Sequence, residues 1–587
     1  MMSSGPDVIP LHISGSSDVD MTRLSSNDMM KWAIANLWQE GKEGGYAVRH
    51  GNQPVRDIPP QINDIERDDW SFFERAFPTL FPYGVGGIEN TRPVPLDFRE
   101  HIQWALQYHD RRFRTHETFS FVAFGILQRR QALGSARLEM KRSNFDRDAH
   151  ILSTITLEDL RTAQAQEEHH QPLSNPAVKL LYSHVHAASA RVMGTDASRY
   201  RHRSQLFSTA LIKYLPVIWV TINFSDLHDP VAQIFAGHEI DMDQFSSAFG
   251  PNSTERAETI ASDPYASACF FHFMLQLVLR TLYGFHVTAY RVSTETGILG
   301  SLSAYYGMVE SQGRGTLHCH LLFWMKDTPS AARIHELLDT EQFRAQVRHY
   351  IRVCFHAHIP GVETRDDLRH IPNEVEIAYS RPPNPDQPNF KEQVQDLEHR
   401  VARAKQVHTC SLGQCLVPDS HGQLKCRRRA PWPCSPTEYI DQYGNWSPER
   451  HFGFLNCWNP FLSCAARCNN DQQLLTNGRD TTDIGYYSTK YMSKAQGRGH
   501  QMSALVANQY AYDAQHTVYA DSLREQQRLL LFRLVNKVNS QQELGAPMVI
   551  SYLMGWGDCY TSHTYTAIYW GTFVGYLLQI FPDLGRY

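Results

Sequence analysis

Thr316-Leu-His-Cys-His-Leu-Leu-Phe-Trp324 decides the fold, because this apolar run holds two histidines and predicts a buried strand. A second strand-like run covers residues 302–310. Gln312-Gly-Arg-Gly315 separates the two runs, which predicts a β-hairpin. Val217-Ile-Trp-Val-Thr-Ile-Asn223 predicts a further buried strand, and residues 267–283 predict a helix. The expected fold class is therefore α+β, with a central antiparallel sheet, helices on one side, and the histidines on a middle strand.

The two histidines of this strand form the first candidate site. Side chains alternate faces along a strand, so His318 and His320 point the same way, about 6.5–7 Å apart along the backbone. Two imidazoles on one sheet face are a natural pair of metal ligands. Glu310 lies opposite His318 if the loop centres on Arg314, whereas a shifted centre would bring Gln312 nearer. The alternative interpretation is a pair of half-buried histidines that only hydrogen-bond to their neighbours.

A second candidate site lies in Asp483-Ile-Gly-Tyr-Tyr-Ser-Thr-Lys-Tyr-Met-Ser-Lys494, where we expect a helix. Tyr487 and Tyr491 are four residues apart and share one helical face, bordered by Lys490 and Lys494. Phenols beside ammonium groups suit attack on a phosphodiester, since nearby cations reduce the cost of ionising a group whose pKa is near 10. The alternative is a tyrosine stripe that packs on the core, with solvated lysines.

Cysteines gather in the segment from residue 410 to residue 434. The spacing H-x-C-x₄-C-x₁₀-C suits a structural zinc site formed by His408, Cys410, Cys415 and Cys426. His421 and Cys434 compete as ligands, and free thiols are the alternative. The arginines at 427–429 are candidates for contacts with DNA phosphates.

The amino-acid composition limits the classes of protein to which this chain can belong. The chain has 587 residues, 42% hydrophobic and 20% charged, which excludes a wholly disordered or low-complexity protein. A net charge of −5 gives no global basic field, so nucleic-acid binding must use local patches. The eleven cysteines and a polar start without an apolar targeting segment indicate a soluble, intracellular protein that binds no membrane.

Six segments are expected along the chain. In order they are a mobile polar tail, a largely helical domain, the first part of the sheet domain, a helical insertion with the Cys/His cluster, the tyrosine helix and a helical C-terminal region. Their bounds are 1–64, 65–205, 206–330, 331–470, 471–500 and 501–587.

Several motifs together resemble a known family. Glu310-Ser-Gln-Gly-Arg-Gly-Thr-Leu-His-Cys-His320 resembles the HUH motif of the Rep endonuclease of Helitron transposons, also called the Helitron helicase-like N-terminal domain. Tyr487-Ser-Thr-Lys-Tyr491 resembles its paired catalytic tyrosines. Residues 219–230, 468–471 and 552–558 are similar to other blocks of the family, and the motif order agrees.

This resemblance implies an HUH-type fold and a mechanism. His318 and His320, with Glu310 or Gln312, would hold one Mg²⁺ or Mn²⁺ on the scissile phosphate of single-stranded DNA. A tyrosine would attack and leave a 5′-phosphotyrosine link, and the second tyrosine would allow strand transfer in rolling-circle transposition. The family also implies a nuclear location.

One departure from the family pattern concerns the helicase. No G-x-x-x-x-G-K-[ST] motif occurs, so we expect this chain to lack ATP-driven unwinding. The chain would then be a fragment of a longer protein, a decayed copy, or a partner of a separate helicase. The alternative functions are a decayed DNA-binding relic of a Helitron transposase, or an unrelated His-x-His metal hydrolase.

Overall fold

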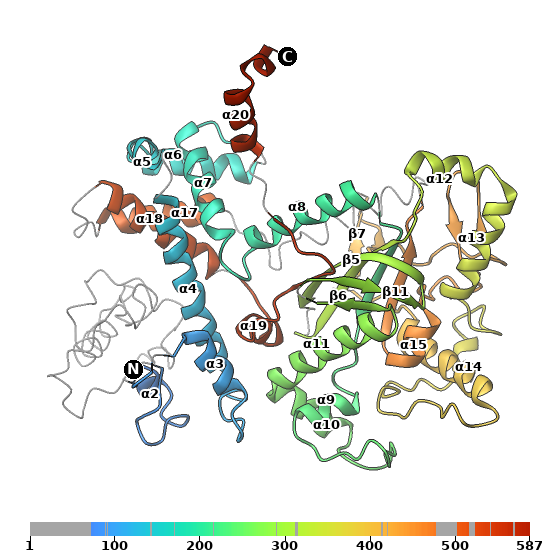
Figure 1. Cartoon of the computed structure of the whole chain (residues 1–587). Helices are drawn as coiled ribbons and strands as arrows, with labels where there is room; N and C mark the ends of the chain where they lie inside the picture. Colours follow the sequence, from blue (N-terminus) through green and yellow to red (C-terminus); the bar gives the residue numbers. More distant parts are fainter. Residues whose placement is uncertain are drawn as a thin grey trace.

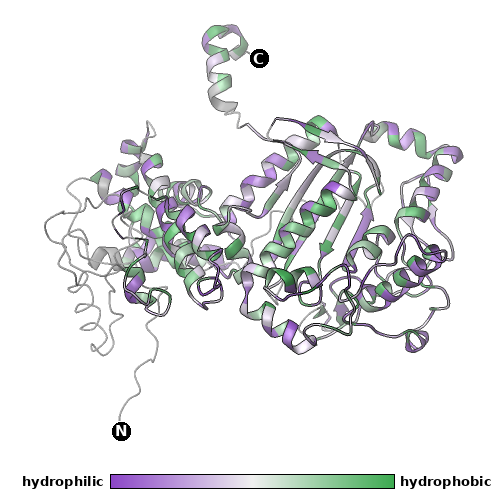
Figure 2. Ribbon diagram, turned by 60° about the horizontal axis from the view of Figure 1, so that its bottom comes forward, coloured by the Kyte–Doolittle hydropathy of each residue, from purple (hydrophilic) through white to green (hydrophobic). Residues whose placement is uncertain are grey.

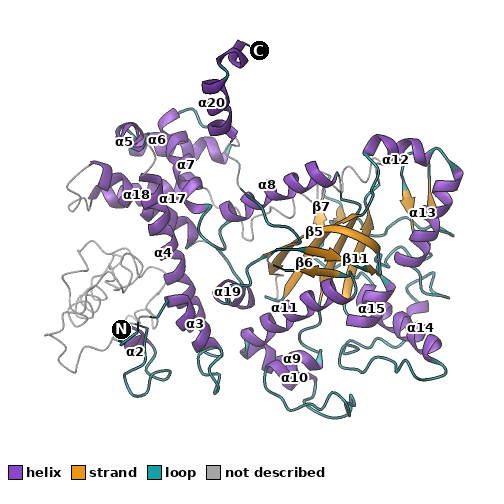
Figure 3. Ribbon diagram, viewed as in Figure 1, coloured by secondary structure: helices purple, strands orange, loops and turns teal. Residues whose placement is uncertain are grey.

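The computed structural model describes residues 72–476, 502–515 and 523–586, apart from residues 89, 91, 95, 141–143, 170, 215, 289, 312–314, 413–414, 420, 541 and 567–569. Within these residues the chain is α+β, as the sequence predicts. Helices surround one antiparallel sheet, and a helical assembly lies to one side of it (Figures 1 and 3).

The central sheet has the strand order β11-β1-β6-β5-β12, with the short strand β4 paired to β5. Every pairing is antiparallel, and the strand that carries the histidines, β6, is the middle one, as expected. The strands span Ile218–Asn223 (β1), Thr296–Gly297 (β4), Gly300–Ser311 (β5), Leu317–Met325 (β6), Asn469–Leu474 (β11) and Cys559–Thr561 (β12). Both edge strands, β11 and β12, come from late in the chain. The sequence predicts only helices for residues 501–587, so it does not predict β12.

The β5–β6 hairpin has the register that a loop centred on Arg314 requires. Glu310 pairs with His318, and Met308 pairs with His320. Gly315 has φ +84°, a left-handed conformation that suits glycine in this tight connection. The register therefore places the Glu310 side chain on the same sheet face as the two imidazoles.

One face of the sheet packs on the main hydrophobic core. Helix α11 (Pro264–Thr281) lies across this face, and its apolar character is visible in Figure 2. Its start is fixed by Pro264 and by the Asp263 side chain, which accepts a hydrogen bond from the Ala266 N–H. Phe271 and Leu275 of α11 join Leu321 and Phe323 of β6 in one buried cluster. The neighbouring helices are α9 (Pro230–Phe235), α10 (Ser253–Ser262) and α19 (Ala546–Leu553).

The opposite face carries the histidines and is also partly covered. Leu206 of α8 (Asp196–Lys213) packs with Trp219, Leu322 and Trp324 in a second buried cluster. The prediction of helices on one side only is therefore wrong. The reason is that this face also carries the apolar side chains of Trp219 and Trp324, which a helix must shield from water.

The helical assembly combines segments from both ends of the chain. Apolar residues of α4, α5, α6 and α7 form one buried cluster with those of α17 and α18. The helices span Phe72–Ala76 (α2), Phe98–Leu106 (α3), Phe119–Met140 (α4), Phe145–Leu152 (α5), Leu157–Glu168 (α6), Pro176–Ser189 (α7), Met502–Gln515 (α17) and Leu523–Asn539 (α18). Helices α4–α7 thus share one core with α17 and α18, whereas α2 and α3 pack with the main core.

The insertion between β6 and β11 mixes helices with short strands. Its small core includes Ile359, Phe452, Leu455 and Trp458. Its elements are α12 (Ala331–Leu338), α13 (Glu341–Cys354), η3 (Asp367–His370), α14 (Phe390–Val401), η4 (Ala402–Gln406), β7 (Leu416–Pro418), β8 (Leu424–Cys426), β9 (Tyr439–Ile440), β10 (Trp446–Ser447) and α15 (Pro460–Ala466). A separate small ribbon consists of β2 (Phe285–Val287) and β3 (Val292–Thr294).

At the end of the chain, α20 (Trp570–Ile580) and η5 (Pro582–Arg586) project away from the other helices (Figure 1). Helix α20 is uncharged and largely apolar. Among the described helices, none combines the length and hydropathy that a bilayer crossing requires.

Candidate metal centre

Glu310, His318 and His320 converge on one face of the sheet. The Nε2 atoms of the two histidines are 3.1 Å apart. Glu310 Oε2 lies 3.7 Å from Nε2 of His318 and 3.8 Å from Nε2 of His320. The circle through these three atoms has a radius of about 2.1 Å, which is the usual distance between a divalent ion and nitrogen or oxygen ligands. The donor atoms are therefore already arranged to hold one divalent cation.

Burial keeps both histidines in the form that binds metals. His318 is 9% exposed and His320 is 6% exposed. Burial lowers the pKa of His318 to about 4 and that of His320 well below its usual 6.5. Because both imidazoles are neutral near pH 7, neither must lose a proton before it ligates a metal.

Two residues of β1 support the His320 ring. Thr221 Oγ1 lies 2.9 Å from Nδ1 of His320. Trp219 stacks on the same imidazole, with 5.1 Å between ring centroids. If Nδ1 donates its proton to Thr221, the lone pair of Nε2 points toward Glu310 and His318. Thr221 is therefore placed to accept the Nδ1 proton in the tautomer that binds metal.

Arg199 is a site residue that sequence reasoning missed. Its side chain is 1% exposed, and a terminal nitrogen lies 2.9 Å from Glu310 Oε1. The other terminal nitrogen donates to the Val309 carbonyl at 3.2 Å and lies 3.4 Å from Asp558. Arg199 thus holds one oxygen of Glu310 and leaves the other directed at the histidines. Its position in α8, far from β5 in the chain, gave no local signal.

A carboxylate from the edge strand extends the same face. Asp471 of β11 pairs with Thr221, which in turn pairs with His320. Burial raises the pKa of Asp471, whereas the positive charges of Arg450 and Arg428 act in the opposite direction. The Arg428 charge also acts on His318. An arginine of the Cys/His insertion therefore lies near the sheet site.

The remaining residues predicted for this site lie outside the described residues. They are Gln312 and the four members of the tyrosine segment, Tyr487, Lys490, Tyr491 and Lys494. The structure thus brings Glu310 to the two histidines and leaves the tyrosine prediction as a prediction.

The Cys/His segment forms a second group of donors. Nε2 of His408 lies 3.3 Å from the sulfurs of Cys410 and Cys426, and 3.6 Å from that of Cys415. All four donor atoms lie within 4.8 Å of one another. Tetrahedral nitrogen and sulfur ligands of zinc are about 3.6 Å apart, so this set fits one such ion.

The two competing ligands lie elsewhere. His421 is exposed at the β7–β8 turn, and the Cys434 thiol donates to the His451 carbonyl. All eleven cysteines are free thiols.

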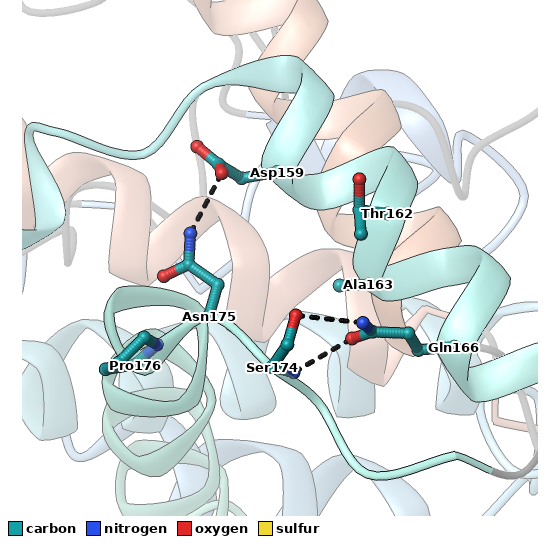
Figure 4. Close-up of a pocket in the computed structure, with 7 residues that line it drawn as sticks. All are labelled: Asp159, Thr162, Ala163, Gln166, Ser174, Asn175 and Pro176. Carbon is teal, nitrogen blue, oxygen red and sulfur yellow. Dashed lines mark hydrogen bonds between the residues drawn. The ribbon is translucent and has the colours of Figure 1, made fainter.

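A shallow pocket between α6 and α7 is unrelated to these groups (Figure 4). Asn175 donates to Asp159 at 2.9 Å, and the Gln166 amide bonds to Ser174. Its polar groups therefore satisfy one another and leave no vacant donor set for a ligand.

These features define an α+β protein with a candidate cation centre on the middle of an antiparallel sheet. Residues 101–323 match the family model described as "Helitron helicase-like domain at N-terminus". This part of the chain is therefore similar to Helitron helicase-like N-terminal domains. The match includes Glu310, His318 and His320 and ends before the Cys/His group. The comparison with curated proteins gave no match.

Proposed function

We propose that the protein is a metal-dependent, single-stranded DNA endonuclease and strand transferase of the HUH type, acting in Helitron-like rolling-circle transposition. The observation that carries this proposal is the convergence of Glu310, His318 and His320 on one ion-sized position, inside the segment that matches the Helitron family model. A separate helicase as partner and a nuclear location belong to the same proposal.

The protein side chains have distinct roles in this proposal. The two histidines and Glu310 hold a Mg²⁺ or Mn²⁺ ion, and Arg199 and Thr221 fix the orientation of these ligands. A bound divalent cation supplies charge neutralisation at the scissile phosphate. Arg428 of the insertion adds a positive charge on the same side, where it would contact the DNA backbone.

The nucleophile in the proposal is one of the paired tyrosines, Tyr487 or Tyr491. Its phenolic oxygen bonds to phosphorus and loses its proton to solvent, and the bond between phosphorus and the 3′ oxygen breaks. The 5′ phosphate stays on the tyrosine, and the 3′ oxygen takes up a proton. Ionising a free tyrosine at pH 7 costs about 4 kcal/mol, which Lys490 and Lys494 would reduce. The other tyrosine then performs the second cleavage or the transfer.

The length of the chain allows this encounter. Leu474 ends β11, two strands away from β6, and lies about 14 Å from His320 by the usual strand spacing and rise. Tyr487 is thirteen residues further along the chain, a distance of at most about 43–47 Å when extended. The tyrosines are therefore within reach of the candidate cation centre.

Incubation with labelled single-stranded DNA and Mn²⁺, followed by a denaturing gel, tests the proposal. We expect a covalent protein–DNA band that disappears in the Tyr487→Phe/Tyr491→Phe double variant and persists in the Tyr486→Phe control. Cleavage that survives in the double variant would indicate a metal hydrolase. DNA binding without cleavage by the wild type would indicate a relic.

A further inference from the structure

A third group of donors lies in the insertion, away from the strands of the sheet. His358 follows α13, and Glu449 and His451 precede α15. Nε2 of His358 is 3.6 Å from Glu449 Oε1, and Nε2 of His451 is 3.3 Å from the same oxygen. The two imidazole rings are 4.2 Å apart between centroids. Donor atoms of all three residues lie within 4.8 Å of one another.

The backbone on both sides of this group is fixed by buried neighbours. Ile359, next to His358, and Phe452, next to His451, are 1% and 6% exposed and belong to the core of the insertion. Arg450 lies between Glu449 and His451 and points the other way, where it is buried and donates to the Pro433 carbonyl. The group is therefore preorganised, because its side chains project from backbone that packing already holds in place.

A neighbouring histidine of the insertion makes a different contact with a glutamate. His356 Nδ1 lies 2.6 Å from Glu398 Oε1, a short hydrogen bond between two partners. At the third group, two imidazoles instead share one carboxylate oxygen at 3.3 and 3.6 Å. Tetrahedral ligands of an ion held at about 2.1 Å are about 3.4 Å apart. These distances suit a shared cation better than a pair of hydrogen bonds.

We propose that His358, Glu449 and His451 form a further metal site, which binds a zinc-class divalent ion. Two imidazoles and one carboxylate form a donor set that zinc-class divalent ions commonly accept. The side chains of the three residues are 20%, 41% and 30% exposed, so water can occupy the remaining coordination position.

The ion would hold together two segments that are distant in the chain. The segment that follows Glu449 pairs with three others: Arg450 with Ser435, Leu455 with Val407, and Trp458 with His356. Since the core of the insertion is small, a metal cross-link is an effective way to stabilise it. The same segment borders the Cys/His group, because the His408 N–H donates to the Phe454 carbonyl. This inference does not depend on the proposed nuclease activity.

The test is the zinc content of the full-length protein. Chelator-stripped, reduced protein is titrated with Zn²⁺, desalted and analysed for bound metal. We expect the His358→Ala/His451→Ala variant to bind one zinc fewer per chain than the wild type. His349→Ala, which removes an exposed histidine of α13, should bind the same number as the wild type. The thiolate–cobalt absorption of the Cys/His group, measured with Co²⁺, should be unchanged in both variants.

An unchanged zinc content and affinity in the double variant would overturn the proposal. So would weak binding that the double variant and His349→Ala lose equally, since that indicates nonspecific histidine binding. If the double variant does not fold, Glu449→Gln replaces it. This near-isosteric change should weaken one zinc site at least about tenfold, and an unaltered affinity would refute the site. Neither measurement uses DNA cleavage, so the outcome is independent of the proposed function.

Discussion

Replacing Thr221 by valine isolates the contribution of one hydroxyl to the sheet site. Valine has nearly the same shape, so the change removes the 2.9 Å contact with Nδ1 of His320 and little else. His320 is 6% exposed, and water cannot readily replace the lost partner. The imidazole is then free to carry its proton on Nε2, where it would face the metal position.

The change should reduce both the metal affinity and the free energy of unfolding. Loss of a supporting hydrogen bond to a metal ligand typically weakens binding about 10–100-fold, or roughly 1.4–2.7 kcal/mol. The cost in unfolding free energy should be about 1–3 kcal/mol, as for one unsatisfied buried group. Thr221→Ser keeps the hydroxyl and should restore most of the affinity.

Mn²⁺ binding can be followed by electron paramagnetic resonance, because the free hydrated ion gives the sharp signal. His320→Ala serves as the control that removes the ligand itself. If Thr221→Val binds Mn²⁺ as tightly as the wild type while His320→Ala does not, Thr221 does not select the tautomer. The reasoning about ligand orientation would then be refuted.

Three further changes test other features. Arg199→Met should lower the free energy of unfolding, measured by urea denaturation, by about 3–5 kcal/mol, because it removes the cation that pairs with the carboxylates of Glu310 and Asp558. A loss below about 1 kcal/mol would contradict this. Burial lowers the pKa of His272 to about 3, so the unfolded chain takes up its proton first as the pH falls below 6.5. The stability advantage of His272 over His272→Gln should therefore shrink by about 2 kcal/mol between pH 7 and pH 5 in urea melts, and an equal advantage at both pH values would be inconsistent with a buried neutral imidazole. A chelator should lower the melting temperature of the wild type more than that of Cys415→Ser in a thermal-shift assay, and equal shifts would argue against metal at the Cys/His group.

The part of the site that the sequence predicts is the part governed by local rules. Alternation along β6 put His318 and His320 on one face, and hairpin geometry put Glu310 opposite them. The same rules could not find Arg199, since its contact with Glu310 spans 111 residues and depends on how α8 crosses the sheet. The contact of Thr221 with His320 likewise required the pairing of β1 with β6.

The edge strands show a similar limit. β11 has the sequence Asn-Asn-Asp-Gln-Gln-Leu, with no apolar alternation, and it is a strand because β1 offers an unpaired edge. β12 has only three residues and follows a helix. Tertiary pairing, and not local propensity, determines both elements. The donors of the third metal group were also missed, because His358 is separated from Glu449 by most of the insertion.

The late position of β12 has a consequence for biosynthesis. The first strand of the sheet, β1, begins at Ile218. The edge strand β12, which pairs with β5, is complete only when Thr561 has been synthesised. During translation the nascent chain must therefore carry an incomplete sheet, with one side of β5 open, until β12 has left the ribosome. Such an open side is prone to pair with other chains, so a chaperone that shields it would be expected to raise the yield of correctly folded protein.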